Sequence, residues 1–151
     1  MSCQNYRIIE MQNTGIGAVP NNQLIPLGRV TRRISTSPGN GVPFQVASSK
    51  ADTIQLTTKG YYKVLYNATL TVGGAGDITL VLLANGTPVY SITHHATAAG
   101  NYNLTLPKEV RVFANCDSCP TNCPMDIQIL NAGQAITGGT SNIIVDSCVN
   151  G

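Results

Sequence analysis

The most regular feature of this sequence is an alternation of hydrophobic and polar residues between Tyr61 and Val72. One side of the alternation consists of Tyr62, Val64, Tyr66, Ala68, Leu70 and Val72, and the other includes Lys63, Asn67, Thr69 and Thr71. Side chains of a strand point to opposite faces in turn, whereas a helix repeats every 3.6 residues. The pattern therefore predicts a strand over 61–72 with one buried face.

Shorter segments of similar character occur along the rest of the chain, separated by Gly, Pro or Asn. Asn85-Gly86 favours a two-residue hairpin because both residue types tolerate positive φ. No segment shows a helical period. We expect strands at 24–35, 43–47, 53–57, 61–72, 78–84, 89–93, 102–106, 109–114, 125–130 and 141–148. About eight to ten antiparallel strands without a helix predict an all-β fold, a β-sandwich of the jelly-roll type.

Residues 1–23 differ from the rest because apolar residues are few and show little periodicity. Turn-forming residues gather at its end, namely Gly15, Gly17, Pro20, Asn21 and Asn22. We predict an extended N-terminal arm over 1–23 that becomes ordered on a neighbouring molecule, followed by the jelly-roll domain over 24–151.

The length of 151 residues fits one domain with one core. Charged residues make up only 11% of the chain, compared with about 25% in an ordinary soluble domain. Since so little charge leaves a protein prone to association, we expect copies of the chain or a partner to cover part of its surface.

The net charge of +2 is too small to favour nucleic-acid binding. No apolar run is long enough to cross a membrane, and the first residues lack the layout of a signal peptide. We therefore expect a protein that is made in the cytoplasm and does not insert into a membrane.

Four cysteines are candidate metal ligands: Cys116, Cys119, Cys123 and Cys148. A C-x2-C pair can hold zinc, but a tetrahedral site needs four ligands, and no second pair lies at a matching distance. Disulfide pairing and reduced thiols in a tight loop are the other two interpretations. We expect no bound cofactor.

The sequence offers little for catalysis. His94 and His95 are adjacent, so on an extended chain their side chains point to opposite sides. No nucleophile elbow, metalloprotease motif or phosphate-binding loop is present, because Gly73-Gly74-Ala75-Gly76 leads into a predicted strand. We expect a protein that is not an enzyme.

Positive charge is densest on the first predicted strand of the domain, where Arg29 and Arg33 share a face and Arg32 takes the other. Salt bridges within or between subunits are one explanation, and docking to an acidic protein surface such as a capsid is another. Nucleic-acid binding is the least favoured, since no aromatic platform accompanies the arginines. The candidate anchoring residues are Arg7, Ile8, Ile9, Met11, Arg29 and Arg33.

The segment Gly60-Tyr61-Tyr62-Lys63-Val64-Leu65-Tyr66 resembles a core strand of the tumour necrosis factor and complement globular-head superfamily. The run GDITLVLLANGTPV, then EVRVFANC with its cysteines and DIQILNAG, resembles small members of that superfamily from phages and Gram-positive bacteria. The resemblance covers about residues 44–149 and implies a TNF-like jelly roll that forms homotrimers.

The resemblance also implies a structural role. It suggests a capsid decoration or head-fibre protein on the surface of a phage head, held by its arm to the major capsid protein or another virion protein. Host surfaces or glycans are further expected partners. The alternative is a trimeric adhesion or coat protein of a bacterial cell or spore surface with the same fold.

Overall fold

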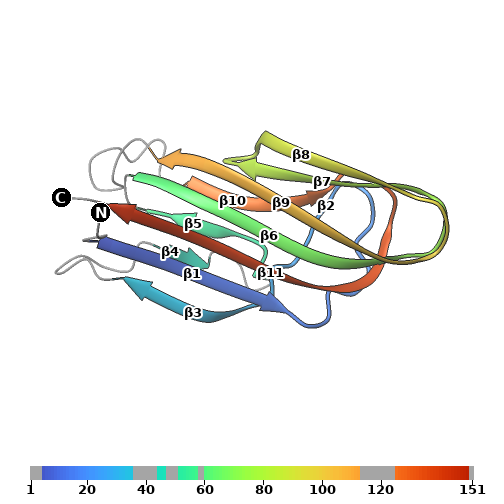
Figure 1. Ribbon diagram of the computed structural model, residues 1–151, viewed down its shortest axis with the longest axis horizontal. Helices are drawn as coiled ribbons and strands as arrows, with labels where there is room; N and C mark the ends of the chain where they lie inside the picture. The colour runs from blue at the N-terminus through green and yellow to red at the C-terminus, as the bar shows by residue number, and fades with distance from the viewer. Residues whose placement is uncertain (1–4, 36–43, 47–50, 58–59, 113–124, 150–151) are drawn as a thin grey trace.

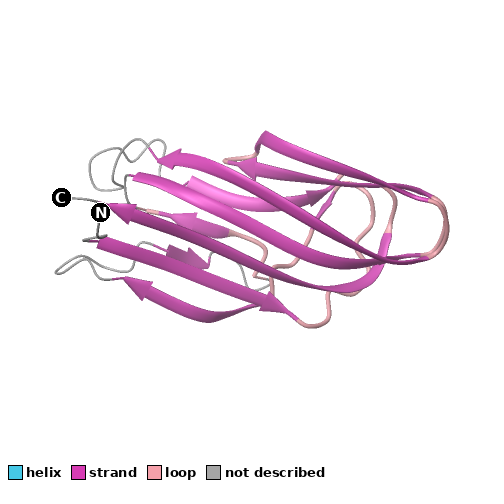
Figure 2. Cartoon of the chain, viewed as in Figure 1, coloured by secondary structure: helices cyan, strands magenta, loops and turns pink. Residues whose placement is uncertain are grey.

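The computed structural model describes residues 5–35, 44–46, 51–57, 60–112 and 125–149, and within them the protein consists of strands and loops without a helix (Figure 2). The strands are β1 (Asn5–Asn13), β2 (Gln23–Leu24), β3 (Arg29–Ser35), β4 (Phe44–Val46), β5 (Ile54–Leu56), β6 (Gly60–Val72), β7 (Gly76–Ala84), β8 (Thr87–Ala96), β9 (Gly100–Val112), β10 (Met125–Asn131) and β11 (Ile136–Val149).

These strands form two antiparallel sheets that pack face to face (Figure 1). One sheet has the order β3-β1-β11-β6-β9, and the other has the order β4-β5-β10-β7-β8 with β2 paired to β10. Neighbouring strands in each sheet are mostly distant in sequence, as in a jelly roll. The predicted all-β jelly-roll class is confirmed.

The core between the sheets follows the alternation seen in the sequence. In β6 every second side chain from Tyr62 to Val72 is buried, and Ile78, Leu80 and Leu82 of β7 meet them from the opposite sheet. Burial of these apolar side chains is the main stabilising term of the fold.

The N-terminal segment differs from the predicted arm. Residues 5–13 form β1, which pairs with β11 on one side and β3 on the other. Ile9 and Met11 are 0% exposed and belong to the core, so among the described residues no boundary separates 5–23 from the domain. The physical reason is that alternate residues of β1 are needed to complete the buried layer. With β1 included, the described residues hold eleven strands.

The predicted strands 102–106 and 109–114 correspond to one strand, β9, which runs to Val112 with Pro107 inside it, and residues 113–114 lie outside the described residues. Proline lacks an N–H and is tolerated at a sheet edge, where one side of the strand is unpaired. Among the described strands, β9 lies at the edge of its sheet and pairs with β6 alone. Pro107 therefore does not interrupt the strand.

The predicted hairpin at Asn85-Gly86 is confirmed. Both residues have positive φ, 52° and 78°, and they connect β7 to β8. The Asn85 side-chain oxygen also accepts a hydrogen bond of 2.8 Å from the Asp126 backbone N–H, which ties the hairpin to β10.

Candidate functional site

The outward face of the five-stranded sheet carries an uncharged array of amide and hydroxyl side chains on β6, β9 and β11. We call this array the Asn–Thr grid; its members are Asn67, Thr69, Thr71, Asn101, Asn103, Thr105, Thr140 and Asn142. The strand register sets them in rows across the three strands. The solvent face of a sheet ordinarily carries Lys and Glu, so a face of this size without charge is suited to contact.

Three threonine hydroxyls of the grid each donate a hydrogen bond to an asparagine carbonyl on the neighbouring strand. Thr69 donates to Asn103 and Thr71 donates to Asn101, both at 2.6 Å. Thr105 donates to Asn67 at 2.9 Å. Since the asparagine oxygens accept these bonds, the N–H₂ groups of Asn67, Asn101 and Asn103 remain as donors for a partner.

A shallow cavity of about 370 Å³ lies over the grid, and the side chains of Asn67, Thr69, Asn103, Thr105, Thr140 and Asn142 surround it. Its lining is uncharged and without an aromatic side chain, and it includes Ala68 and Leu104 besides the polar residues. The cavity can offer hydrogen bonds but no ionic contact.

Near the start of β6 and the end of β11, the same face carries charged and apolar side chains in place of amides and hydroxyls. One row carries Asp146, Lys63 and Glu109 on β11, β6 and β9, and the next carries Ile144, Leu65 and Pro107. Leu65 is 37% exposed. The face thus combines a charged row and an apolar row at one end with the uncharged grid at the other.

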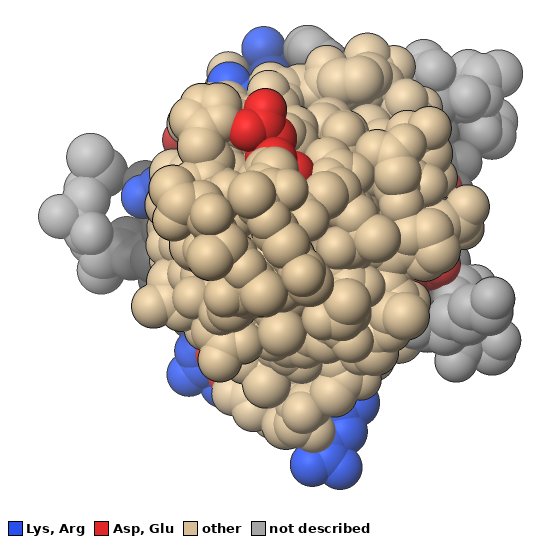
Figure 3. Space-filling model, turned by 90° about the vertical axis from the view of Figure 1, so that its right-hand side faces the viewer, with Lys and Arg blue, Asp and Glu red and all other residues tan. Residues whose placement is uncertain are grey.

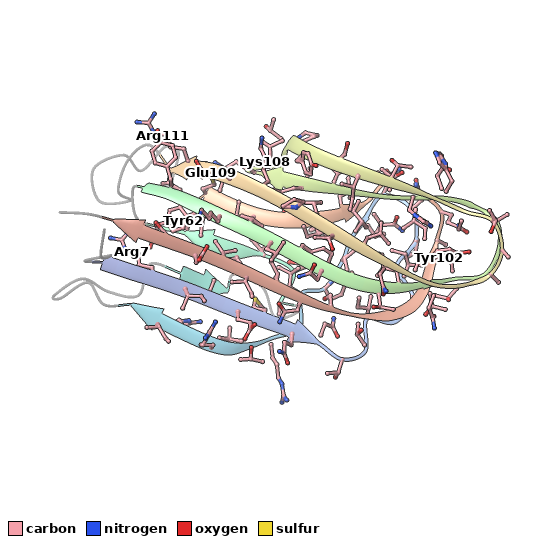
Figure 4. The ribbon with its side chains drawn as sticks, in the orientation of Figure 1. Arg7, Tyr62, Tyr102, Lys108, Glu109 and Arg111 are labelled. Carbon is pink, nitrogen blue, oxygen red and sulfur yellow. The ribbon has the colours of Figure 1, made fainter. Side chains whose placement is uncertain are left out.

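Along one side of the sandwich, edge strands β8 and β9 leave an open seam between the sheets. We call Tyr90, His94, Tyr102 and Lys108 the seam residues. The Lys108 ammonium lies 5.9 Å from the centre of the Tyr90 ring, and the rings of His94 and Tyr102 are 5.0 Å apart. Lys108, Glu109 and Arg111 lie near one end of β9, and Tyr102 lies near the other (Figure 4).

A larger cavity of about 580 Å³ lies around the edge of β9. Its lining includes Leu65 and Pro107 from the sheet face and Tyr90 and Lys108 from the seam. We call it the seam groove. Lys63 and Glu109 also line it, so the groove combines apolar walls with charged groups of both signs, as protein-binding surfaces do.

The two histidines diverge as predicted. His94 contacts Tyr102 across the seam, whereas His95 on the opposite side of β8 pairs with Asp77. The end of the sandwich formed by the β6–β7 and β8–β9 turns is mostly uncharged, with one acidic patch (Figure 3). Among the described residues no three potential ligands gather to hold a metal ion.

Two buried tyrosines of β6 have perturbed acidity. Burial raises the pKa of Tyr62, and this rise is partly offset by the positive charge and hydrogen bond of Arg7. Burial raises the pKa of Tyr66 to about 12, and the nearby Ser141 hydroxyl opposes the rise. Arg7 and Tyr62 lie at the same end of the sandwich (Figure 4). Both side chains are fully buried, and neither lines the cavity over the grid or the seam groove.

The structure divides the predicted anchoring residues into two groups. Ile8, Ile9 and Met11 are at most 2% exposed, and Arg7 is also buried. With β1 inside the sheet, these four side chains are not available at the surface. Arg29 and Arg33 are exposed on β3, an edge strand.

The predicted metal candidates Cys116, Cys119 and Cys123 lie outside the described residues. The backbone of Cys148 lies in β11 opposite Tyr6. The structure therefore leaves the three interpretations of the cysteines as they stood.

Sequence reasoning missed both the grid and the seam. The grid had a signal, because Asn and Thr occupy the polar positions of 67–71 and of 101–105. Lys108 gave a second signal, since it follows the same alternation as the buried residues Leu106 and Val110 and is itself exposed. The sequence alone does not reveal the strand register that places β9 and β11 on either side of β6.

The described residues contain no helix of sufficient length and apolarity to span a membrane. No protein-family profile matches the sequence. No curated protein sequence matches it significantly.

Solved structures do match, and they agree on the fold. Eiger TNF from S. frugiperda aligns with a TM-score of 0.66 at 10% identity over 99% of this chain and 96% of that one. The globular domain of zebrafish complement 1qA aligns with a TM-score of 0.62 at 8% identity over 95% and 98%. The PRD1 vertex protein P5 aligns with a TM-score of 0.57 at 14% identity over 99% and 100%. The chain has a TNF-like jelly-roll fold.

Proposed function

We propose that this protein is a structural protein of a bacteriophage virion, a homotrimer that decorates the head or forms a head fibre. The observation that carries the proposal is the likeness in fold to the PRD1 vertex protein P5 over 99% of this chain. The proposed role is binding and display at the particle surface, and it requires no catalysis.

Self-association follows from the sheet face. The Asn–Thr grid offers amide donors and no charge, so covering it with a second copy removes no ion from water. The low charge of the whole chain, 11%, supports the same conclusion. In a trimer, a neighbouring subunit would cover the uncharged Asn–Thr grid.

Attachment to the particle is assigned to β3, because β1 is part of the core. Arg29, Arg32 and Arg33 are exposed there, and none forms an ion pair with another described residue. Arginine pairs well with carboxylates of a capsid surface. A trimer presents three such strands, so modest single contacts add up to durable binding.

A trimeric protein of a bacterial cell or spore surface is the second candidate. The likeness to Eiger TNF and to the complement 1qA globular domain favours it, because the fold is also found outside virus particles. In that case the same β3 arginines would bind an acidic component of the coat.

Two measurements test the proposal. Light scattering of the purified full chain should give about three times the subunit mass of 15.9 kDa, and a stable monomer at micromolar concentration would contradict the homotrimer. Mass spectrometry and electron microscopy of purified phage particles should find the protein on the head. Its recovery from spore coats or cell walls instead would favour the second candidate.

A further inference from the structure

β3 is an open edge of the five-stranded sheet (Figure 1). Among the described strands it pairs with β1 alone, so the backbone on its other side has no partner strand there. From Arg29 to Ile34 every side chain except that of Val30 is exposed. Backbone N–H and C=O groups along such an edge can pair with an extended segment of another chain, which then adds one strand to the sheet.

The other edges among the described strands are less suited to strand addition. β4 has only three residues. β8 and β9 contain Pro88 and Pro107, each of which lacks the N–H that a new strand would need. β9 also carries charges of both signs, whereas β3 contains three arginines, no acidic residue and no proline. β3 is therefore the described edge whose chemistry selects one kind of partner.

A β-bulge in β3 sets the directions of its side chains. The register passes from Arg32 opposite Glu10 to Val30 opposite Met11, so Thr31 is an extra residue in the strand. The Thr31 hydroxyl donates to the Glu10 backbone carbonyl and to its carboxylate, both at 3.3 Å. These contacts fix the bulge on its neighbour β1.

The bulge places arginines on both faces of the edge. Arg33 stands opposite Ile9, which points into the core, and Arg29 stands opposite Gln12, which is on the other face of β1. The prediction that Arg29 and Arg33 share a face is therefore wrong, because the extra residue reverses the alternation between them. Arg32 takes the same face as Arg29. A strand added to β3 would have a cation beside it on either face.

These arginines select against most strands and in favour of acidic ones. Charged side chains and bulges at an edge discourage pairing with an arbitrary strand. Opposite charges on neighbouring strands stabilise their pairing, so carboxylates on the incoming strand convert the obstacle into an attraction. None of the three arginines forms an ion pair with a described residue. Ile34, which is 42% exposed, offers an apolar contact at the same edge.

We infer that the edge of β3 binds an extended acidic segment of the partner protein as an additional strand, which rests on the proposed attachment through β3 and names its partner. Backbone hydrogen bonds supply the affinity, and the arginines on the two faces supply the selectivity for carboxylates. β3 has seven residues, so the segment is of ordinary strand length, about five to seven residues. A trimer offers three such edges to one particle.

Synthetic peptides and the full-length protein test strand addition. The probe is a capped ten-residue peptide in which pairs of glutamates alternate with threonine and valine, so that both faces carry carboxylates. One control peptide has glutamine for every glutamate, and another has N-methyl groups along its backbone and keeps every charge. Fluorescence anisotropy should show each control binding at least about tenfold more weakly than the probe, because one loses the charge and the other the backbone donors.

Variants and hydrogen exchange locate the binding. Arg33→Glu should weaken binding of the probe at least about fivefold. Arg111→Glu is the matched control, since it makes the same charge change on β9, and it should keep the affinity. Circular dichroism checks the fold of both variants. Hydrogen exchange should slow in residues 29–35 when the probe binds, and β8, an edge of the other sheet, should not change.

Equal binding of the probe and the N-methylated peptide, or binding without slower exchange in β3, would overturn strand addition and leave attachment through the arginines standing. Equal binding of the glutamine peptide would overturn the acidic selectivity. A protein that attaches to particles but binds none of the peptides would also reject the inference. A protein that binds the probe along β3 but attaches to no phage particle would contradict the proposed function and leave the strand-binding edge in place.

Discussion

At the residue scale, Tyr66 places a phenol at the centre of an apolar core. Its hydroxyl and that of Ser141 are buried, and neither has a partner with good hydrogen-bond geometry among the described residues. A buried hydroxyl without such a partner costs free energy. Tyr66→Phe should therefore leave the free energy of unfolding unchanged or raise it by up to about 1 kcal/mol. Urea denaturation at pH 7 measures this, and a loss of stability would show that the hydroxyl is well satisfied.

The same tyrosine makes stability depend on alkaline pH. The unfolded chain has a tyrosine pKa of 10.0, and burial raises that of folded Tyr66 to about 12. Between these values the unfolded state has lost a proton that the folded state keeps, so stability is complete below pH 10 and falls as pH rises toward 12. The full effect is about 3 kcal/mol. Tyr62 adds in the same direction.

Denaturation curves at pH 9, 10.5 and 11.5 measure this alkaline loss. Tyr66→Phe should lose less stability than the wild type across the range, and spectroscopic titration should show its tyrosinate absorbance completing earlier. Equal losses in the two proteins would place the alkaline sensitivity elsewhere.

Gly139 of β11 lies where its backbone approaches the backbone of Thr69 closely. A Cβ at this position would lie 2.3 Å from the Thr69 carbonyl oxygen, and its φ is +147°. Gly139→Ala should therefore cost about 3 kcal/mol of unfolding free energy. Gly138→Ala is the matched control, because a Cβ there meets nothing within 4 Å. Thermal unfolding of the pair checks the difference, and equal stability would contradict the packing.

At the element scale, β1 decides whether the N-terminal segment is an arm or part of the domain. Met11 is fully buried and Gln12, its neighbour on the opposite face, is exposed. Met11→Ala should lower the free energy of unfolding by about 2–5 kcal/mol through cavity formation. Gln12→Ala should change it by less than about 0.5 kcal/mol. Chemical denaturation of the two variants measures these free energies. A small effect of Met11→Ala would favour the interpretation of the N-terminal segment as an arm.

The elements also show why sequence reasoning succeeded for β6 and failed for β1. β6 has uninterrupted apolar positions from Tyr62 to Val72, so its period of two is visible. In β1 the inward positions are Arg7, Ile9 and Met11, and the charge hides the alternation. Pro107 hid the length of β9 in a similar way, because its tolerance depends on an edge that only the topology creates.

The candidate site was harder to predict than the fold. Local alternation identifies which side chains of a strand are polar, and that was enough to mark Asn67, Thr69 and Thr71 as outward. Their function depends on partners 30 or more residues away, such as Asn101 and Asn103. Strand order sets that pairing, and the order of a jelly roll depends on the packing of the whole core.

At the scale of the whole molecule, attachment is assigned to β3 at the edge of the five-stranded sheet, and self-association to the uncharged face of β6, β9 and β11. β3 is one edge of that sheet and β9 is the other. The exposed arginines of β3 therefore lie away from the seam groove. Because β1 lies between β3 and the strands of the Asn–Thr grid, we expect that a β3 variant can remove attachment without disturbing the trimer.

The last prediction follows from that separation. Arg29→Glu with Arg33→Glu should abolish binding to particles that lack the protein, because three subunits each lose two cations facing an acidic surface. Light scattering should still give the mass of the wild-type assembly. Arg29→Lys with Arg33→Lys is the control, and it should keep most of the binding, since it keeps the charge and loses only the bidentate geometry. Co-sedimentation at increasing salt measures the effect, and wild-type binding should weaken as salt screens the contacts. Undiminished binding by the reversed variant would show that another surface attaches the protein.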